Sequence, residues 1–303
     1  MLAGQRDRGS ERGRRRRRTT EQLLLLIDVF WLTNRHICCS NRSLWVQGGG
    51  EVLCWRRRGW SLRLALWGLA NRWADRSWYI SKFVWDTWDP RKRKPTRARL
   101  PVISELPEGV VSTEERSGFF FVGRWIPNKG LRLLLDAYKA AKLDKEQWPL
   151  RVAGDGPLRE EVLNKISEEK IEGVETLGFV SEEKRKELTR RTKWMVTPPN
   201  TNEDLGLTPL EARSVGVPCI VTNDGGLRET GGQDALRCEP GDLQGLTHLL
   251  ETAAKMPELE YINRSQQTKE ELSNYLEPLS RYGEEYRKPV SYTHLTLPTN
   301  REV

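Results

Sequence analysis

Two glutamates at a fixed spacing are the clearest candidates for chemistry in this sequence. Glu203 and Glu211 are separated by seven residues in the stretch N-E-D-L-G-L-T-P-L-E-A-R-S-V-G-V-P, which runs from Asn202 to Pro218. Because both oxygens of a carboxylate accept hydrogen bonds, a glutamate suits the paired hydroxyl groups of a sugar. The tetrapeptide T-P-L-E from Thr208 also has the pattern of a capping box, with threonine as the N-cap and proline as the first helical residue. The stretch alone leaves both interpretations open.

The start of the same expected helix is a candidate phosphate site. Gly206 precedes Leu207 and Thr208, whose amides lack partners within a helix that begins there. Free amides and the positive end of the helix dipole attract anions. Glu203 then lies in the loop before the helix and Glu211 on its first turn, so in this interpretation the two carboxylates flank a bound diphosphate.

A pair of cations follows an expected strand further upstream. In the run V-G-R-W-I-P-N-K-G, Gly123 ends the strand, Arg124 follows it, and Lys129 comes just before the next helix. Two cations beside a helix N-terminus can clamp a diphosphate. The alternative is that both are solvated loop charges.

A tight turn with the sequence G-D-G-P follows the next expected strand and contains Gly154 and Gly156. Its glycines permit a ligand to approach the backbone closely, but they suit a sharp turn equally well. The turn is not a Walker loop, because G-K-[ST] does not follow it, and G-x-G-x-x-G is also absent from the sequence.

The elements that must position these residues alternate regularly from about residue 105 onward. Short apolar runs predict strands at 119–123, 150–153, 174–177, 194–197, 219–222 and 235–238. Amphipathic spacing predicts helices at 131–141, 158–171, 182–191, 208–215 and 243–254. The alternation is typical of an α/β fold, a Rossmann-like parallel sheet with helices on both faces. Ligands of such sheets bind outside the carboxyl ends of the strands, where the loops described above are expected.

The N-terminal third has a different composition. Residues 1–100 carry 23 Lys and Arg against 8 Asp and Glu, whereas the remainder carries 27 against 34, so the net charge of +8 describes neither part. Richness in Arg, Trp, Gly and Cys is typical of GC-rich DNA read outside its frame, and we expect an irregular, disordered or artefactual segment at 1–60. The basic run at 14–18 and the apolar run at 23–32 leave peripheral membrane contact as an alternative. We expect no nucleic-acid partner.

Other segments carry less information. Residues 62–73 have helical spacing, residues 77–84 suit a short strand that leads into a helix, and the charged, proline-bounded stretch 89–99 suits a linker. Cys219 and Cys238 lie in apolar runs, which is typical of buried core thiols. The five cysteines include no C-x-x-C pair and give no metal-site spacing, so a reducing, cytoplasmic setting is expected.

The order of the motifs resembles a known enzyme family. The chain contains, in succession, F-F-F-V-G-R-W-I-P-N-K-G, R-V-A-G-D-G-P-L, L-G-F-V-S, the stretch with the two glutamates, D-G-G-L-R-E-T and E-P-G-D. Together they look like the nucleotide-sugar-binding domain of family 4 (group 1) retaining glycosyltransferases of the GT-B fold. The resemblance covers roughly residues 105–290.

The resemblance implies roles for single residues. Arg124 and Lys129 match the basic pair that neutralises the donor diphosphate. Glu203 matches the first glutamate of the E-x7-E motif, which contacts the donor sugar, and Glu211 matches the second, which holds the ribose. The expected catalytic residues are therefore Arg124, Lys129 and Glu203. In addition to Glu211, the residues expected to bind the donor are Gly123, Gly154, Gly156, Gly206, Leu207 and Thr208. They would act as backbone donors or as glycines that line the nucleotide cleft.

The resemblance also implies a function and a domain order. The function is hexosyl transfer from a nucleoside-diphosphate sugar to a saccharide or lipid-linked acceptor with retention, in cell-envelope polysaccharide or glycan synthesis, without a metal or cofactor. It would take place in the cytoplasm or at the inner face of the membrane. Residues 61–104 would be a remnant of the N-terminal GT-B domain with its linker, and 291–303 a tail that does not look native. The alternatives are a nucleotide-sugar-binding module without catalysis and a GT-B sugar-nucleotide epimerase.

A further loop, Asp224-Gly225-Gly226 with Glu229, also matches the family. Its expected role is a turn and a helix cap rather than a ligand contact.

Overall fold

The computed structural model describes residues 37–40, 43–48, 51–55, 77–88, 97–99, 106–107, 109, 112–200, 203–276 and 280. The chain divides into two units, Met1–Ser77 and Trp78–Val303. In the first unit, β1 (Ile37–Ser40), β2 (Ser43–Gly48) and β3 (Glu51–Trp55) form an antiparallel sheet. These strands lie in the segment for which we expected irregular or disordered structure. The predicted helix at 62–73 and the tail at 291–303 lie outside the described residues.

The second unit is built on a six-stranded sheet in which every pairing is parallel. The strands are β6 (Ser117–Val122), β7 (Leu150–Ala153), β8 (Val174–Gly178), β9 (Thr192–Thr197), β10 (Cys219–Thr222) and β11 (Leu236–Cys238). Their order is β11-β10-β9-β6-β7-β8, so the direction of winding reverses between β6 and β9. In an open parallel sheet, ligands bind at such a switch point, outside the carboxyl ends of the strands.

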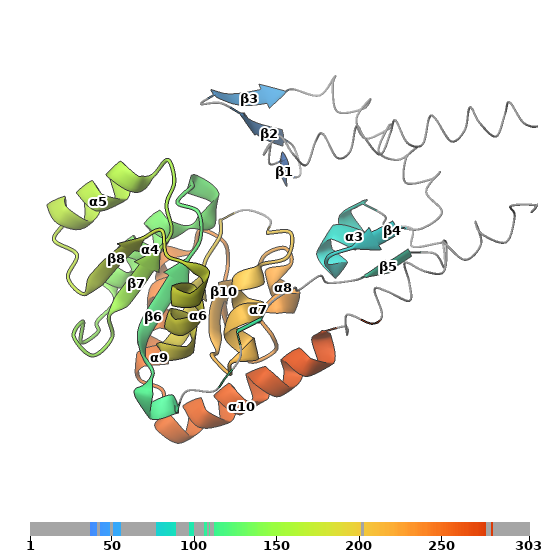
Figure 1. The fold of residues 1–303 in the computed structure, drawn as a ribbon. Helices are drawn as coiled ribbons and strands as arrows, with labels where there is room; N and C mark the ends of the chain where they lie inside the picture. The colour runs from blue at the N-terminus through green and yellow to red at the C-terminus, as the bar shows by residue number, and fades with distance from the viewer. Residues whose placement is uncertain are drawn as a thin grey trace, which may run out of the picture. The chain divides into compact units, whose positions relative to one another are not determined.

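Helices cover both faces of this sheet (Figure 1). They are α4 (Leu131–Ala140), α5 (Arg159–Glu168), α6 (Glu182–Arg191), α7 (Leu207–Ser214), α8 (Leu227–Thr230), α9 (Leu243–Ala254) and α10 (Glu258–Tyr275). Successive side chains of a strand point to opposite faces. Accordingly, Phe119 and Phe121 of β6 join the core cluster that contains Leu134 of α4, whereas Phe120 joins the cluster that contains Ala212 of α7. The α/β fold class is confirmed.

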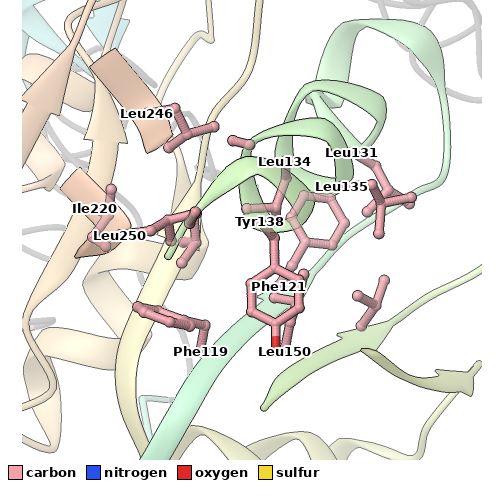
Figure 2. Close-up of a cluster of buried hydrophobic side chains, with 14 of the residues drawn as sticks. Phe119, Phe121, Leu131, Leu134, Leu135, Tyr138, Leu150, Ile220, Leu246 and Leu250 are labelled. Atoms are coloured by element: carbon pink, nitrogen blue, oxygen red, sulfur yellow. The ribbon is translucent and has the colours of Figure 1, made fainter. Parts of the chain in front are cut away.

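The larger core cluster lies between the sheet and helices α4 and α9. Figure 2 shows Leu134 and Tyr138 of α4 and Leu250 of α9 gathered around Phe119 and Phe121. The rings of Phe119 and Tyr138 meet edge to face at 6.4 Å between centroids. Apolar burial of this kind is the main favourable term in folding, and here it fixes the position of the strand whose end carries Gly123.

The long helix α10 was not predicted from the sequence. Its inward residues include Tyr261, Ser265 and Thr268, two of which are polar, so its apolar stripe is weak. Arg116 and Arg213, which are both buried, hold it by polar contacts. Arg116 donates to Ser265 Oγ at 3.1 Å, and Arg213 donates to the carbonyl oxygen of Thr268 at 3.3 Å.

A smaller part of the second unit precedes the sheet. Strand β4 (Ser77–Tyr79) leads into α3 (Lys82–Trp88), as predicted for 77–84, and β4 pairs with β5 (Arg97–Arg99). Strand β5 lies in the stretch expected to be a linker, and that expectation is wrong for 97–99. Among the described residues, no helix is long and apolar enough to cross a membrane.

Candidate functional site

The loop after β6 folds back onto the turn that follows β7. Gly123 N donates to the carbonyl oxygen of Ala153 at 3.2 Å, and Trp125 N donates to that of Asp155 at 2.9 Å. The Trp125 ring is buried. Arg124 is exposed and has no ion-pair partner among the residues that the structure describes. The loop is therefore anchored through its backbone and through Trp125, which leaves the Arg124 guanidinium available to a ligand.

The two glycines of the G-D-G-P turn are required by this packing. Gly154 has a φ of 126°, and a Cβ on it would lie 1.9 Å from the carbonyl oxygen of Gly123. On Gly156 a Cβ would lie 2.6 Å from the carbonyl oxygen of Trp125. Contacts this short are excluded sterically. The glycines thus serve the packing of two loops against each other, and their contact with a nucleotide remains a prediction.

Lys129 and Glu203 form an ion pair across the switch point. The Lys129 Nζ to Glu203 Oε2 distance is 2.5 Å, and the two side chains are 27% and 20% exposed. The backbones of the two loops also meet, because Asn200 N donates to the carbonyl oxygen of Asn128 at 3.1 Å. The structure therefore brings together two of the three predicted catalytic residues, Lys129 and Glu203. Within the described part of the chain, Lys129 has a carboxylate partner and Arg124 has none.

The backbone around Glu203 is held by the loop after β10. Gly226 N donates to the carbonyl oxygen of Glu203 at 2.6 Å, and Thr230 Oγ1 donates to that of Leu205 at 2.9 Å. Asp224 is buried in the same loop, and burial raises the pKa of its carboxyl. The expected turn is present here, and its contacts fix the loop that carries Glu203.

Residues before the sheet hold the same loop from another direction. The buried Ser81 donates from Oγ to the carbonyl oxygen of Asp204 at 2.6 Å. Phe83 N, in the first turn of α3, donates to Glu229 Oε1 at 2.9 Å. Glu229 therefore accepts a hydrogen bond from the first turn of α3, a tertiary contact that sequence pattern cannot show.

Helix α7 begins one residue earlier than predicted, and the capping box is wrong. Gly206, with a φ of 81°, is the N-cap and has no side chain to cap the helix, and Leu207 is the first helical residue. Pro209 thus occupies the third helical position, which is tolerated because the first-turn amides have no partner within the helix. The amides of Leu207 and Thr208 lie at this helix N-terminus, as the phosphate interpretation requires. Leu207 is 51% exposed, and Thr208 is half-buried.

Glu211 pairs with a residue that the sequence did not single out. Its carboxylate contacts Arg185 of α6, and the side chains are 13% and 25% exposed for Glu211 and Arg185. Burial raises the pKa of Glu211, and the charge and hydrogen bond of Arg185 oppose that shift. Glu211 therefore does not reach back to the helix start. Nothing in the local pattern distinguishes Arg185 from the other cations of α6, so only the tertiary contact reveals it.

Two solved structures illustrate the similarity of fold. The crystal structure of Anabaena Alr3699/HepE in complex with UDP-glucose has a TM-score of 0.65 at 18% identity, and the match covers 77% of this chain and 68% of that one. The apo form of the lipopolysaccharide outer core galactosyltransferase WaaB has a TM-score of 0.57 at 18% identity, covering 74% of this chain and 64% of that one. At these identities the likeness shows the fold.

Sequence comparison gives curated relatives and a family. O-antigen chain mannosyltransferase B of Escherichia coli is 31% identical over 136 residues, which are 44% of this chain and 35% of that protein. The uncharacterized glycosyltransferase MJ1178 of Methanocaldococcus jannaschii is 29% identical over 109 residues, 36% of this chain and 29% of its own length. The match thus spans about a third of these relatives. The family model described as "Glycosyl transferases group 1" matches residues 103–270, and the chain belongs to this family.

Proposed function

We propose that this chain binds a nucleoside-diphosphate sugar and belongs to an enzyme that transfers the hexosyl group to an acceptor hydroxyl with retention. The observation that carries the proposal is the Lys129–Glu203 ion pair at the switch point of the sheet. At this point, a cation that suits a diphosphate lies within hydrogen-bond distance of a carboxylate that suits sugar hydroxyls. The first amide of α7, that of Leu207, comes only four residues after Glu203.

The charges around this point fit the leaving group of such a reaction. When the bond between the anomeric carbon and the phosphate oxygen breaks, negative charge develops on the diphosphate. Lys129, Arg124 and the amides at the start of α7 would stabilise that charge by fixed positive groups. The acceptor oxygen forms the new bond on the same face of the sugar, and its proton passes to the leaving phosphate oxygen. The protein then needs no cofactor, since its cations and amides supply the positive charge.

Glu203 would orient the sugar and Glu211 the ribose. Each carboxylate is partly shielded from water and paired with one cation, Lys129 or Arg185. A carboxylate has about four lone-pair sites, so a single cation leaves acceptor capacity for a pair of hydroxyls. Two such carboxylates, on either side of the first turn of α7, give the site one acceptor group for each sugar of the donor.

Isothermal titration calorimetry with UDP and GDP tests the binding step. UDP-glucose is the first donor to assay, because Alr3699/HepE was crystallised with it and shares the fold. We expect binding of one nucleoside diphosphate with a Kd in the micromolar range, about −8 kcal/mol. Absence of binding to both nucleotides, in a protein that unfolds cooperatively, would overturn the proposal.

A turnover assay then separates transfer from its alternatives. Release of UDP or GDP that depends on an added saccharide or lipid-linked acceptor supports transfer. Nucleotide-sugar binding without turnover identifies a binding module without catalysis, and conversion of the donor sugar without any acceptor identifies an epimerase. The acceptor proposed is a cell-envelope glycan or its lipid-linked precursor, since one relative is an O-antigen chain mannosyltransferase. Such an acceptor would be met in the cytoplasm or at the inner face of the membrane.

A further inference from the structure

Arg185 contacts the candidate site through the side chain of Glu211. Arg185, in the second turn of α6, lies with its Nη1 against Glu211 Oε2 of α7. The pair is mostly shielded from water, with Glu211 13% and Arg185 25% exposed. Exposed ion pairs contribute little to stability or orientation, but a shielded pair interacts through a lower effective dielectric constant. The contact therefore restricts the two side chains more than an exposed ion pair would.

The neighbouring charges leave Arg185 directed at Glu211. Its other acidic neighbour, Glu182, lies one turn earlier in α6 at 4.0 Å, and Glu182 is closer to Lys186, at 2.8 Å. Arg185 therefore contacts Glu211 more closely than it contacts any other carboxylate among the described ion pairs.

The contact matters because the Glu211 side chain is largely shielded from water, with 13% of it exposed. Burial disfavours the charged form of a carboxyl group and raises its pKa, while Arg185 acts in the opposite direction. Without the guanidinium, the carboxyl would be easier to protonate and free to change rotamer. A protonated or rotated carboxyl is a poorer acceptor for two adjacent hydroxyls than an ionised one held in place.

We propose that Arg185 is a positioning residue for the ribose-binding carboxylate of Glu211. It touches no part of the ligand and acts by holding the Glu211 carboxylate in place and ionised through Oε2. This inference rests on the proposed function, namely that the site binds a nucleoside diphosphate. It adds a specificity determinant on α6, an element that carries none of the other candidate residues.

The experiment is calorimetry of Arg185→Met with three ligands: UDP, 2′,3′-dideoxy-UDP and inorganic pyrophosphate. Methionine keeps the apolar stem and removes the charge. We expect the affinity for UDP to fall about tenfold, which is about 1.4 kcal/mol, while the affinity for pyrophosphate stays within about twofold. The ratio of UDP to dideoxy-UDP affinity should fall with it. Arg185→Lys should recover part of the loss, because it restores the charge.

Two further variants complete the design. Lys184→Met removes a neighbouring cation on the exposed side of α6, where its partner is Glu187 at 3.1 Å, and should leave all three affinities unchanged. In the Glu211→Gln background, Arg185→Met should have little further effect, because the residue acts through Glu211. An equal loss in both backgrounds would overturn the inference by showing direct contact with the ligand.

The remaining outcomes separate the inference from the proposed function. If the wild type binds neither UDP nor GDP, the proposed function itself fails. If the wild type binds UDP and prefers it to the dideoxy analogue, and Arg185→Met keeps both properties, the function stands and the role of Arg185 is refuted. Loss of pyrophosphate binding in Arg185→Met, with a lowered melting temperature, would assign Arg185 a structural role. In that case Arg185→Lys would regain stability without regaining the preference for UDP over dideoxy-UDP.

Discussion

Lys129 Nζ lies 2.5 Å from Glu203 Oε2, and this ion pair joins the loop after β6 to the loop after β9. The cation expected at the diphosphate and the carboxylate expected at the donor sugar are therefore partners in the ligand-free protein. A negatively charged diphosphate would compete with Glu203 for Lys129, whereas the sugar hydroxyls would only share Glu203 with it. Neutralising Lys129 should therefore lower the affinity for UDP, whereas neutralising Glu203 should leave that affinity unchanged or raise it.

Lys129→Ala should weaken UDP binding far more than it destabilises the fold. A hydrogen bond to a charged group contributes about 1.5–3 kcal/mol, so the affinity should fall roughly tenfold to a hundredfold. The free energy of unfolding should fall by no more than about 1 kcal/mol, because the ion pair is partly exposed. Calorimetry and urea denaturation measure the two quantities. Parallel losses in affinity and stability would show that Lys129 is structural. Lys142→Ala, at an exposed position, is the matched control.

Glu203→Gln should leave UDP binding intact or stronger and should lower the preference for UDP-glucose over UDP. The substitution releases Lys129 from its partner, which favours an anionic ligand, and it weakens the acceptor for the sugar hydroxyls. Titration of both ligands into wild type and variant gives the ratio of affinities. A loss of UDP affinity as large as that of Lys129→Ala would contradict this assignment and would mean that Glu203 positions Lys129.

The alternation of elements could be predicted because the central strands β6, β7, β9 and β10 are short, mostly buried runs rich in apolar residues. The bounds 150–153, 182–191, 219–222 and 243–254 were predicted as the structure has them. Strands such as Cys219–Thr222, with all four residues buried, leave no ambiguity of face or length. Cys219 and Cys238 are buried and free, as predicted. The alternation also predicted that Lys129 and Glu203 lie at the same edge of the sheet, outside the carboxyl ends of the strands.

Features that depend on contacts distant in sequence could not be predicted. The residue pattern T-P-L-E fits a capping box, but Gly206 takes the N-cap because its left-handed φ suits the chain entry, and Glu211 turns to Arg185 instead. Helix α10 has polar residues on its buried face, where Arg116 and Arg213 supply the partners. Local periodicity contains none of this information, because Arg185 lies 26 residues from Glu211 and the partners on α10 lie 55 and 149 residues from Arg213 and Arg116.

Gly123→Ala and Gly154→Ala should separate ligand approach from loop packing. A Cβ on Gly123 would meet nothing closer than 3.8 Å, so this variant should keep its stability. A Cβ on Gly154 would lie 1.9 Å from a backbone oxygen at a φ of 126°, and the variant should lose about 3 kcal/mol or more. If a ligand approaches the strand end closely, Gly123→Ala weakens UDP binding at unchanged melting temperature. Unchanged affinity would remove Gly123 from the site.

Arg213→Met should destabilise the protein by about 3 kcal/mol, because it removes a buried guanidinium from its partners. Arg213 is 1% exposed and donates to the carbonyl oxygens of Thr230 and Thr268 at 2.9 and 3.3 Å. Both carbonyls would lose this donor. Arg228→Met, at an exposed position, should cost less than about 0.5 kcal/mol. Urea denaturation of the three proteins checks the comparison, and equal midpoints would refute the role of Arg213 in holding α10.

Asp224 should make the protein less stable as the pH rises from acid toward neutral. The residue is 8% exposed, and burial raises the pKa of its carboxyl above the unfolded value, with Arg228 partly opposing the shift. A raised pKa means that the folded state binds more protons, so the contribution to stability is complete below the unfolded pKa of about 3.9 and is lost as the pH passes through the folded pKa. Asp224→Asn cannot ionise, so the difference in unfolding free energy between variant and wild type should increase in favour of the variant over this window. Urea denaturation at intervals from pH 4 to pH 8 measures the difference, with the exposed Glu172→Gln as control. A difference that is independent of pH would contradict the assignment.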